Sequence, residues 1–547
     1  MADNQSDNYR YMNRFVLLLF VLVLGVDTMS FSQNFDEMRK RFDDFKNQNR
    51  KEFTDFRNQC NREYADFMRA AWEQFGAKPP VERPVEEKPV EPIDYVAPDP
   101  GKEKKEVVKH EFDEVIEVEV PQPQPEPAFP IVERPKGAVL PGMGSLGGVN
   151  PKVQMQNREK KIQDTIKFKK INPEDLLPYE ERFEFVFLGT RASVRIAPEQ
   201  KIMVTKCKEG VIADAWEKYS SGDYDNLIYD CLQLRVKHSL CDWAYLTMLH
   251  ELSKAYYGED NNSAVLMTAY IFCQSGYQIR LGMGNEGTKL VLLYASRHMI
   301  FEKPYFTLDD GENYYTFNYE GKTLNICKAK FPKEQPLSLL IGNSLALDTQ
   351  DFKERKLQSK QYASANADVR VNKNLIDFYD NYPASILGDN TMTRWAMYAN
   401  APLDMEVVDA LYPSLRKSIE GKSEADALNV LLNFVQTAFV YEYDNKVWGR
   451  DRVFFAEETL YYPYCDCEDR SILFSRLVRD LLKLDVLLVY YPGHLATAVK
   501  LNQQVRGDYI ILNDGNYIVC DPTYINAPIG ETMPKMDNSK AKLILLK

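Results

Sequence analysis

The sequence predicts an α+β protein made of several parts. From about residue 160 to the C-terminus, segments with helical spacing of apolar residues alternate with short runs typical of strands. A proline-rich stretch separates this region from the start of the chain. The chain of 547 residues is long enough for about three domains, and its apolar fraction of 44% is typical of globular cores.

The N-terminal residues 1–32 have the features of a secretory signal peptide. Arg10 and Arg14 precede the apolar run Phe15–Val26, and small residues at Ser30–Ser32 suit a cleavage site. The run has 12 residues, fewer than the roughly 18 expected of a membrane-spanning helix. We therefore expect an extracytoplasmic protein, periplasmic or secreted, with no transmembrane span in the mature chain. If the segment is not cleaved, it would anchor the chain to a membrane.

Residues 33–76 predict a charged amphipathic helix with an aromatic stripe. Phe42, Phe53, Tyr64 and Phe75 recur every 11 residues, and a helix of 3.6 residues per turn nearly closes after that interval. The stripe predicts either self-association through a coiled coil or docking of the helix on its own chain.

Residues 77–155 predict a linker rich in proline and glutamate. Of the 29 prolines in the chain, 15 lie between Pro79 and Pro151. Segments such as PQPQPEP and PGMGSLGG cannot bury a core, so we expect an extended spacer. The run EVIEVEV (114–120) predicts a local strand within it.

Residues 156–330 predict an α/β domain that resembles the C-terminal region in the order of its elements. The expected helices are Asp242–Ala255 and Ser263–Cys273, and the expected strands are Leu290–Tyr294, Tyr305–Leu308 and Tyr314–Asn318. Helices followed by strands recur near the C-terminus, so this domain is a candidate degenerate second copy, with Asp260 in the place of Cys467. The alternative is two unrelated segments.

A β-rich connecting region is predicted at residues 331–404, and a C-terminal domain at residues 405–547. PLSLLIG and ADVRVNKNLIDFY supply the alternating segments of the connecting region. The C-terminal domain is expected to open with helices at Met405–Glu420 and Ala425–Tyr441.

Composition and motifs exclude several classes of function. A net charge of −12 and a pI near 5.3 argue against a nucleic-acid partner, since phosphates would be repelled. Nine cysteines over this length do not make a disulfide scaffold. The G-x-G-x-x-G matches at Gly142 and Gly282 lack a following helix, so they are interpreted as turns and no cofactor is expected.

Three polar residues of the C-terminal domain predict nucleophilic chemistry. Cys467 opens a predicted helix that begins within Asp466–Asp469, where the helix dipole favours a thiolate and the acidic neighbours oppose it. His494, the only histidine after His298, follows the tight turn Pro492–Gly493 at the head of a predicted strand. Asp521 ends a later strand, where it can orient the imidazole. These residues predict a catalytic Cys-His-Asp triad.

The same residues resemble the transglutaminase-like superfamily. Cys467–Leu473 (CEDRSIL) is similar to the C-x-D-x-A-x-L motif, and Asp521–Thr523 to the D-P-T segment. The resemblance covers about residues 405–530 and includes AEETL (456–460), which resembles the segment before the motif. It implies a papain-like fold and acyl transfer from a protein or peptide substrate by Cys467, His494 and Asp521. We expect a peptidase or amidase, with transamidation as the other outcome.

The chain departs from the family pattern at positions that concern the substrate pocket and the oxyanion hole. Cys465 stands where the family often has glycine, Leu495 and Ala496 stand where an aromatic residue is common, and Tyr517 stands where tryptophan is frequent.

Other interpretations of the site remain open from the sequence. Cys465, Cys467, His494 and Cys520 are soft ligands, although a C-x-C pair is a poor structural zinc clamp. A Cys465–Cys520 disulfide would leave Cys467 available. A non-catalytic scaffold that assembles through residues 33–76 is the alternative function.

Overall fold

The computed structural model describes residues 57–84, 89–97, 115–117, 181–220, 224–317, 319–332, 334–349 and 352–546. The chain divides into two units, Met1–Arg62 and Glu63–Lys547. The predicted signal peptide and the first part of the predicted aromatic helix lie outside the described residues. The sheets named below, and all the labelled helices, lie in the second unit.

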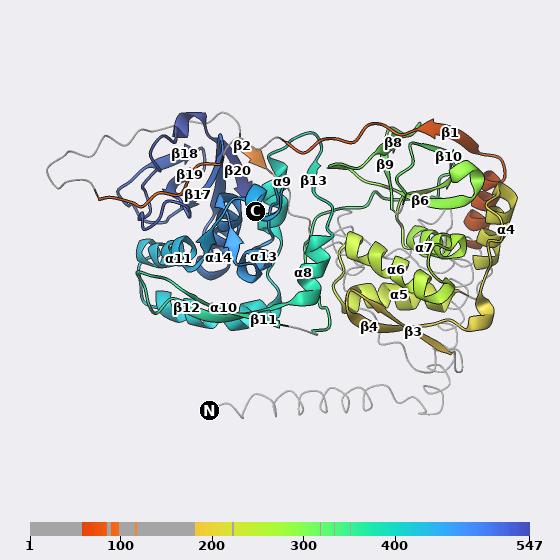
Figure 1. Cartoon of the computed structure of the whole chain (residues 1–547), viewed down its shortest axis with the longest axis horizontal. Helices are drawn as coiled ribbons and strands as arrows, with labels where there is room; N and C mark the ends of the chain where they lie inside the picture. Colours follow the sequence, from red (N-terminus) through yellow and green to blue (C-terminus); the bar gives the residue numbers. More distant parts are fainter. Residues whose placement is uncertain are drawn as a thin grey trace, which may run out of the picture. The chain divides into compact units, whose positions relative to one another are not determined.

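The first lobe, residues 182–332, is built on a six-stranded sheet with strand order β1-β10-β5-β6-β9-β8 (Figure 1). Every pair of neighbouring strands in it is antiparallel. The strands are β1 (Trp72–Gly76), β5 (Ile279–Gly284), β6 (Lys289–Ala295), β8 (Tyr305–Thr307), β9 (Asn313–Thr316) and β10 (Thr323–Cys327). Alternate residues of β6, including Val291 and Leu293, pack into a core on one face of this sheet.

The second lobe, residues 352–546, is built on another six-stranded sheet, with strand order β18-β19-β17-β16-β20-β2. Its neighbours are antiparallel except β2 and β20, which run parallel. The strands are β2 (Val115–Glu117), β16 (Val486–Tyr491), β17 (His494–Lys500), β18 (Tyr509–Leu512), β19 (Gly515–Cys520) and β20 (Lys542–Leu546).

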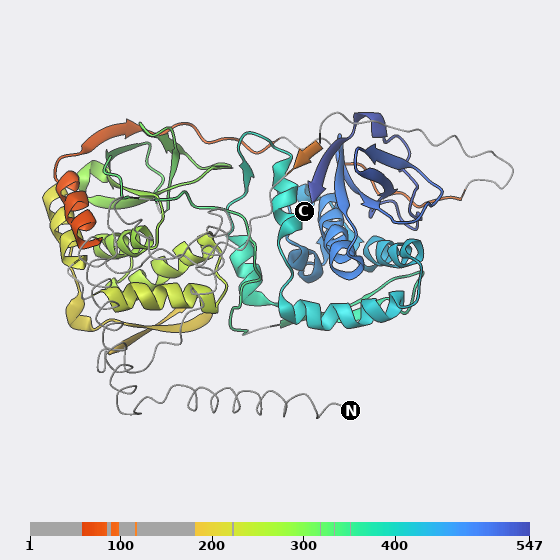
Figure 2. The same cartoon turned by 180° about the vertical axis from the view of Figure 1, so that it is seen from behind.

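In each lobe, helices lie against one face of the large sheet, and a two-stranded hairpin lies beyond them (Figures 1 and 2). The first lobe has the hairpin β3 (Arg182–Phe187)–β4 (Thr190–Arg195) and helices α4 (Glu209–Tyr219), α5 (Asp225–Lys237), α6 (Asp242–Tyr257) and α7 (Asn262–Gln274). The second has the hairpin β11 (Phe352–Gln358)–β12 (Asn366–Asn372) and helices α8 (Lys373–Asp380), α9 (Thr393–Asn400), α10 (Met405–Ile419), α11 (Glu424–Ala438), α12 (Asp444–Val447), α13 (Ala456–Tyr461) and α14 (Cys467–Leu482). This mixture of helices and antiparallel sheets confirms the predicted α+β class.

The two large sheets have the same chain topology. In each, a helix leads into a hairpin (β5–β6 or β16–β17), a second hairpin pairs with the second strand of the first, and the last strand returns beside the first. The sixth strand of each sheet, β1 or β2, comes from upstream of the lobe that it completes. The lobes thus repeat one arrangement of five strands and one helix.

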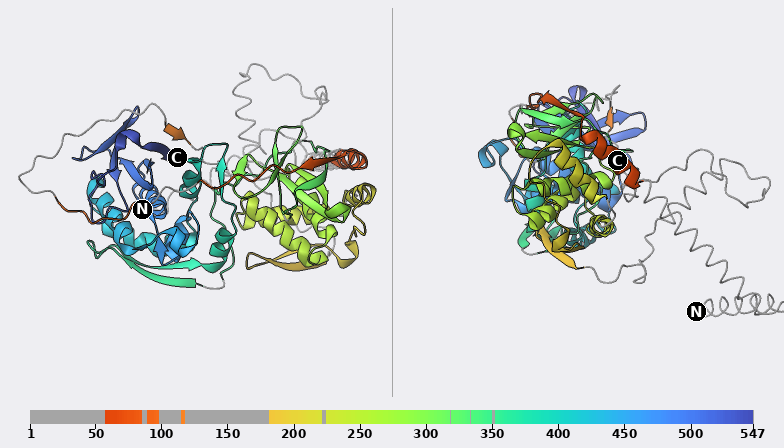
Figure 3. Two further views of the ribbon diagram at one scale, coloured as in Figure 1. Left: turned by 45° about the horizontal axis from the view of Figure 1, so that its top comes forward. Right: turned by 90° about the vertical axis from the view of Figure 1, so that its right-hand side faces the viewer.

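The predicted helix over residues 33–76 is wrong at its C-terminal end. Residues 57–68 are helical, but Trp72–Gly76 forms β1 and pairs with β10 along the edge of the sheet (Figure 3). Helical periodicity carries no information about a pairing partner so distant in sequence, and this tertiary contact determines the local structure.

Tyr64, one residue of the aromatic stripe, is buried within its own chain. Its ring packs 4.9 Å from that of Trp216 and 5.6 Å from that of Phe331. For this residue, the contacts favour docking over self-association.

Parts of the predicted linker are ordered against the lobes instead of acting only as a spacer. Val115–Glu117 is not a local strand but β2, the edge of the second sheet (Figure 1). Residues 77–84 make backbone hydrogen bonds with the first lobe, and residues 89–97 with the second. An edge strand has unpaired backbone groups that can bind any extended chain, whatever its side chains. The proline-rich composition of the linker therefore did not predict these contacts.

The predicted β-rich region 331–404 also contains helices. ADVRVNKNLIDFY divides into β12 and α8, whose N-cap Asn372 accepts the amide of Asn374. Within PLSLLIG only Leu337 forms a β-bridge, with Ser296, and α9 follows β13 (Ser385–Leu387). Among the described residues, no helix combines the length and apolar character needed to cross a bilayer.

Candidate active site

Cys467 is the first residue of α14, as the sequence predicts. The side chain of the N-cap residue Asp466 accepts the amides of Glu468 at 3.1 Å and Asp469 at 3.4 Å, and Asp469 Oδ2 in turn accepts the Asp466 amide at 3.1 Å. This capping box fixes where the helix begins. The Cys467 side chain therefore lies at the positive end of the helix dipole, in a buried position with 4% of its surface exposed.

The acidic neighbours of Cys467 are directed toward other groups. Burial, followed by the charge of Asp466, raises the pKa of Asp469 well above its usual value. Glu468 accepts a hydrogen bond from the indole of Trp395 and lies 3.6 Å from the guanidinium of Arg394. The opposition to a thiolate that the sequence predicts is reduced by these contacts.

His494 and Asp521 form a buried pair. His494 Nε2 lies 2.9 Å from Asp521 Oδ2, and their side chains are 0% and 1% exposed. The other carboxylate oxygen, Oδ1, accepts the amides of Thr523 at 2.8 Å and Tyr524 at 3.2 Å. Asp521 is thus fixed by two backbone donors while it holds one nitrogen of the ring.

The second ring nitrogen of His494 is left available. Nδ1 is buried and has no hydrogen-bond partner in the described structure. With Nε2–H donated to the carboxylate, the neutral ring carries its lone pair at Nδ1. The pair therefore presents a base at Nδ1.

The head of β17 is positioned by a tight hairpin. Tyr491 pairs with His494 across a two-residue turn in which Gly493 has a φ of +74°, a conformation that suits glycine. The hydroxyl of Ser471, on α14, donates to the carbonyl of Leu495 at 2.8 Å. This bond ties the helix that carries the cysteine to the strand that carries the histidine.

Two buried side chains that the sequence analysis missed hold the segment around Asp521. Gln436 Nε2 donates to the carbonyls of Asp521 at 3.0 Å and Tyr524 at 2.7 Å. Arg470 donates to the carbonyls of Gln436 at 3.2 Å and Phe439 at 3.0 Å. Both side chains bind backbone carbonyl oxygens, and such contacts leave no motif in the sequence. An arginine on the apolar side of a predicted helix could still have indicated a buried structural role for Arg470.

Cys467 and His494 line a common pocket of about 480 Å³, which includes the space at its open mouth. The other residues lining it are Pro84, Thr391, Met392, Arg394, Trp395, Glu468, Tyr490, Gly493 and Leu495. Trp395 stacks on Tyr490 with ring centroids 5.1 Å apart. Trp395 and Arg394 come from α9, in the region that the sequence predicts to be connecting strands.

The soft ligands considered for zinc are not brought together. Of the described residues, the one group of His, Cys, Asp or Glu suited to a metal is Asp444, Asp451 and Glu468, whose ligand atoms lie within 4.8 Å of one another. Arg394 lies 2.5 Å from Asp451 Oδ2 and supplies positive charge to this group.

None of the nine cysteines, all of which are described, forms a disulfide. Cys465 and Cys520 are both buried, with Cys465 Sγ 3.8 Å from the carbonyl of Val440 and Cys520 Sγ 3.5 Å from that of Ile518. Burial raises the pKa of both thiols. The alternative pairing of Cys465 with Cys520 is therefore absent from the structure.

The first lobe has different side chains at the corresponding places. Its helix α7 begins with Asn262, so Asp260, aligned with Cys467 from the sequence, lies two residues too early. Asn262 accepts the amide of Leu290 at 2.9 Å and donates to Thr288 at 3.0 Å, on either side of Lys289 at the head of β6. A helix start meets a strand head here too, without a thiol or an imidazole.

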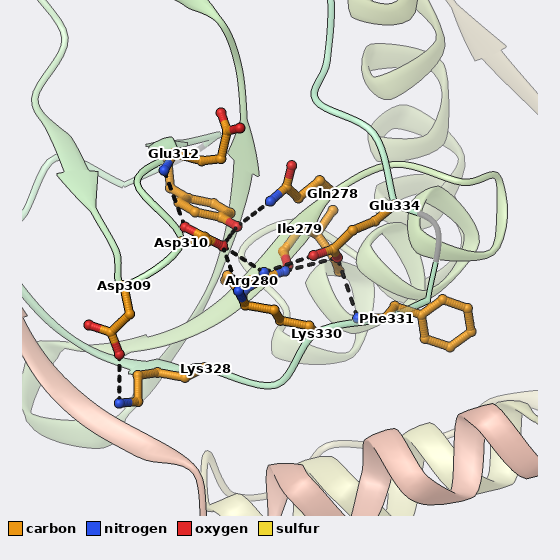
Figure 4. A network of polar contacts seen from close by, with 11 residues as sticks. Gln278, Ile279, Arg280, Asp309, Asp310, Glu312, Lys328, Lys330, Phe331 and Glu334 are labelled. Carbon is orange, nitrogen blue, oxygen red and sulfur yellow. Dashed lines mark hydrogen bonds and ion pairs between the residues drawn. The ribbon is translucent and has the colours of Figure 1, made fainter.

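One network of charged side chains in the first lobe surrounds the buried Arg280 (Figure 4). Its guanidinium binds Glu334 through two bonds of 2.9 and 2.8 Å and Asp310 through one of 3.0 Å. Tyr314 donates to Asp310 at 2.8 Å and accepts from Gln278 at 2.8 Å. Lys330 lies 3.8 Å from Asp310, so two cations face two carboxylates, which suits a structural role.

Comparison of the chain with models of known protein families, with curated proteins and with solved structures finds no match. Function is therefore inferred from the side chains of the chain itself.

Proposed function

We propose that the second lobe is a cysteine acyltransferase of the transglutaminase-like type that acts mainly as a peptidase or amidase. The observation that carries the proposal is the His494 ring, held by Asp521 at Nε2, with a buried and unpartnered Nδ1. His494 lines one pocket with Cys467, which begins α14. Nucleophile, base and orienting acid are the three parts that thiol-based acyl transfer requires.

The reaction that these groups support has two steps. His494 Nδ1 takes the thiol proton, and the sulfur of Cys467 forms a bond to the substrate carbonyl carbon. The carbon–nitrogen bond then breaks as the imidazolium returns the proton to the leaving amine. Water attacks the resulting thioester with His494 again as base, which releases a carboxylic acid and restores the thiol. An amine in place of water would give transamidation.

The shared topology of the lobes supports a degenerate copy. Both lobes contain a helix followed by five strands in the same order, and the first has Asn262 and Lys289 where the second has Cys467 and His494. We infer that the first lobe descends from the same fold and has lost the chemistry. The signal-like residues 1–32 make an extracytoplasmic location part of the proposal.

Thiol labelling tests the proposal directly. Near neutral pH, iodoacetamide is expected to modify Cys467 faster than any other cysteine, and His494→Ala is expected to slow this reaction by about tenfold or more. Cys241 is the matched control, because it is half-buried whereas the other eight cysteines are buried. Loss of solvation raises the pKa of its thiol to about 12, so it should react slowly although it is the more accessible thiol. Labelling that persists in Cys467→Ala, or that is unchanged in His494→Ala, would contradict an activated thiolate.

The low exposure of the site favours one alternative, a non-catalytic scaffold. Cys467 and His494 are 4% and 2% exposed, and a scaffold needs no access to them. It predicts no labelling of Cys467 under conditions where the folded protein is intact. Hydrolysis of a peptide amide by wild-type protein, but not by Cys467→Ala, would eliminate this alternative.

A further inference from the structure

Residues 89–97, named here the strap, lie along the surface of the second lobe (Figure 2). The amide of Val90 donates to the carbonyl of Gly493 at 3.0 Å. Further along, Tyr95 donates to the carbonyl of Ile525 at 2.8 Å, and Ile525 donates to the carbonyl of Ile93 at 3.0 Å. The strap is therefore held by its backbone at both ends.

Two side chains of the strap are half-buried against the lobe. Val90 and Tyr95 pack against a cluster of Tyr524, Ala527 and Met533. The Tyr95 ring meets that of Tyr524 edge-on at 5.5 Å. Val96, in contrast, is 81% exposed, so the strap is fixed by an apolar residue and an aromatic residue five positions later.

The strap adjoins the residues proposed to be catalytic. Gly493 precedes His494 and lines the same pocket as Cys467, and its carbonyl is the acceptor for Val90. Tyr441 donates to the carbonyl of Val90 at 3.5 Å. After burial, the charge of Cys467 is the largest cause that raises the pKa of Tyr441, which indicates that this ring lies near the thiol.

This mode of contact does not require the exact sequence of the strap. Backbone hydrogen bonds recognise any chain in extended conformation, while pockets for alternate side chains supply selectivity. Pro92 has no amide hydrogen, but the two donors that the lobe uses belong to Val90 and Tyr95. A second extended polypeptide could therefore replace the strap.

We propose that the strap occupies the groove in which the second lobe binds its substrate, and that this substrate is a polypeptide in extended conformation. Its recognition features are a β-branched apolar residue at the position of Val90 and an aromatic residue at the position of Tyr95. Naming the occupant a substrate rests on the proposed function. By groove we mean the surface of the lobe that the strap covers between Gly493 and Ile525. Its existence does not depend on the proposed function.

A labelled peptide with the sequence of residues 89–97 tests the groove by fluorescence anisotropy on the full-length protein. In the wild type, the strap competes at the high effective concentration of a tethered segment. Tyr95→Ala and, independently, Val90→Asp in the protein loosen the strap and are expected to increase peptide affinity by about tenfold. Val96→Ala is the matched control and is expected to bind the peptide as the wild type does. Equal affinity in all four proteins, or no binding to any, would overturn the groove.

A second peptide, with proline in place of Val90, lacks the amide that binds Gly493. It is expected to bind the Tyr95→Ala protein about fivefold more weakly than the parent peptide. The parent peptide is also expected to slow iodoacetamide labelling of Cys467. If peptide binds but Cys467 is unreactive in every protein, the catalytic proposal fails and the groove stands. If Cys467 reacts and bound peptide leaves its rate unchanged, the groove does not lead to the thiol and this inference fails.

Discussion

The two lobes repeat one order of strands, yet they have different chemical groups where a helix start meets a strand head. In the second lobe these groups are Cys467 and His494, with Asp521 directly after β19. In the first they are Asn262 and Lys289, and Phe317 directly follows β9. Asn262 is hydrogen-bonded to the backbone on both sides of Lys289, so this one side chain connects the start of α7 to the start of β6.

The comparison teaches that this fold does not require a thiol, an imidazole and a carboxylate at these places. The first lobe forms its sheet without them. In the second lobe, His494 Nδ1 is buried without a partner, an arrangement that costs stability. A side chain that lowers stability and is not needed to form the fold suits a chemical role.

The largest expected difference between the lobes is the effect on activity of replacing the residue at the helix start. Cys467→Ala is expected to lower the rate of amide hydrolysis by about 10⁴-fold or more, because no nucleophile remains. Asn262→Ala should leave the rate unchanged and lower the stability by about 1 kcal/mol, from two lost backbone bonds. Hydrolysis of a peptide amide and denaturant unfolding measure both variants. Comparable loss of activity in both would show that the helix start matters for folding alone.

The next largest effect concerns the orientation of the histidine. Asp521→Asn keeps an oxygen for the amides of Thr523 and Tyr524 but replaces the acceptor of His494 Nε2–H with an NH₂ group. The imidazole is then expected to adopt the other tautomer, with its proton on Nδ1, so that Nδ1 can no longer act as a base. We expect kcat to fall by about 10³- to 10⁴-fold with little change in KM. The pH profile of labelling at Cys467 should also shift. An unchanged profile would mean that the carboxylate does not control the base.

Much of this site could be predicted because its chemical residues lie at the ends of regular elements. Cys467 follows a capping aspartate, His494 follows Pro-Gly, and Asp521 precedes a proline, all of which are local signals. Their catalytic role stays a prediction. Trp395 and Gln436 could not be predicted in the same way, since their contacts join segments distant in sequence and depend on tertiary packing.

The same limit explains the errors in the fold. Trp72–Gly76 continues an aromatic pattern that is helical by period, but its amides pair with β10. Val115–Glu117 has the composition of a strand, yet only the fold supplies its partner β20. Local propensity thus predicted the type of most elements in the lobes. It could not predict the edge strands β1 and β2, whose partners lie far away in the sequence.

Two fully buried arginines sharpen the comparison of the lobes by stability. Arg280 forms ion pairs with Glu334 and Asp310, and Lys330 also lies 3.8 Å from Asp310. Arg280→Met therefore leaves the Glu334 carboxylate without its cation and should cost about 3–5 kcal/mol of unfolding free energy. Because this network is in the first lobe, labelling of Cys467 should be unchanged while the protein is folded. Chemical denaturation and labelling at low denaturant are the measurements.

Arg470→Met is the matched change in the second lobe. Arg470 donates to the carbonyls of Gln436, in α11, and Phe439, directly after it. Because Gln436 in turn binds the Asp521 carbonyl, the loss of Arg470 is expected to shift Asp521 and slow the labelling of Cys467. If Arg280→Met slowed labelling as much as Arg470→Met does, the lobes would be coupled more tightly than their separate cores suggest.

The smallest expected effect is an opposite dependence of the two lobes on pH. Burial lowers the pKa of His298, in the first lobe, from 6.5 to about 4. The unfolded chain then binds more protons between these values, so stability is present above pH 6.5 and is lost as pH falls toward 4. Burial raises the pKa of Glu457, in the second lobe, from 4.5 to about 8. Here the folded chain binds more protons, so stability is present below pH 4.5 and is lost as pH rises toward 8.

Hydrogen exchange resolved by segment separates the two effects. Exchange in β6 and β9 should accelerate as pH falls from 6.5 to 4 after correction for the intrinsic rate, and exchange in α13 and α14 as pH rises from 4.5 to 8. Glu457→Gln keeps an oxygen for the amide of Asp404, which Glu457 accepts at 2.8 Å, and should abolish only the second dependence. A loss of both dependences in this variant would mean that the lobes unfold as one cooperative unit.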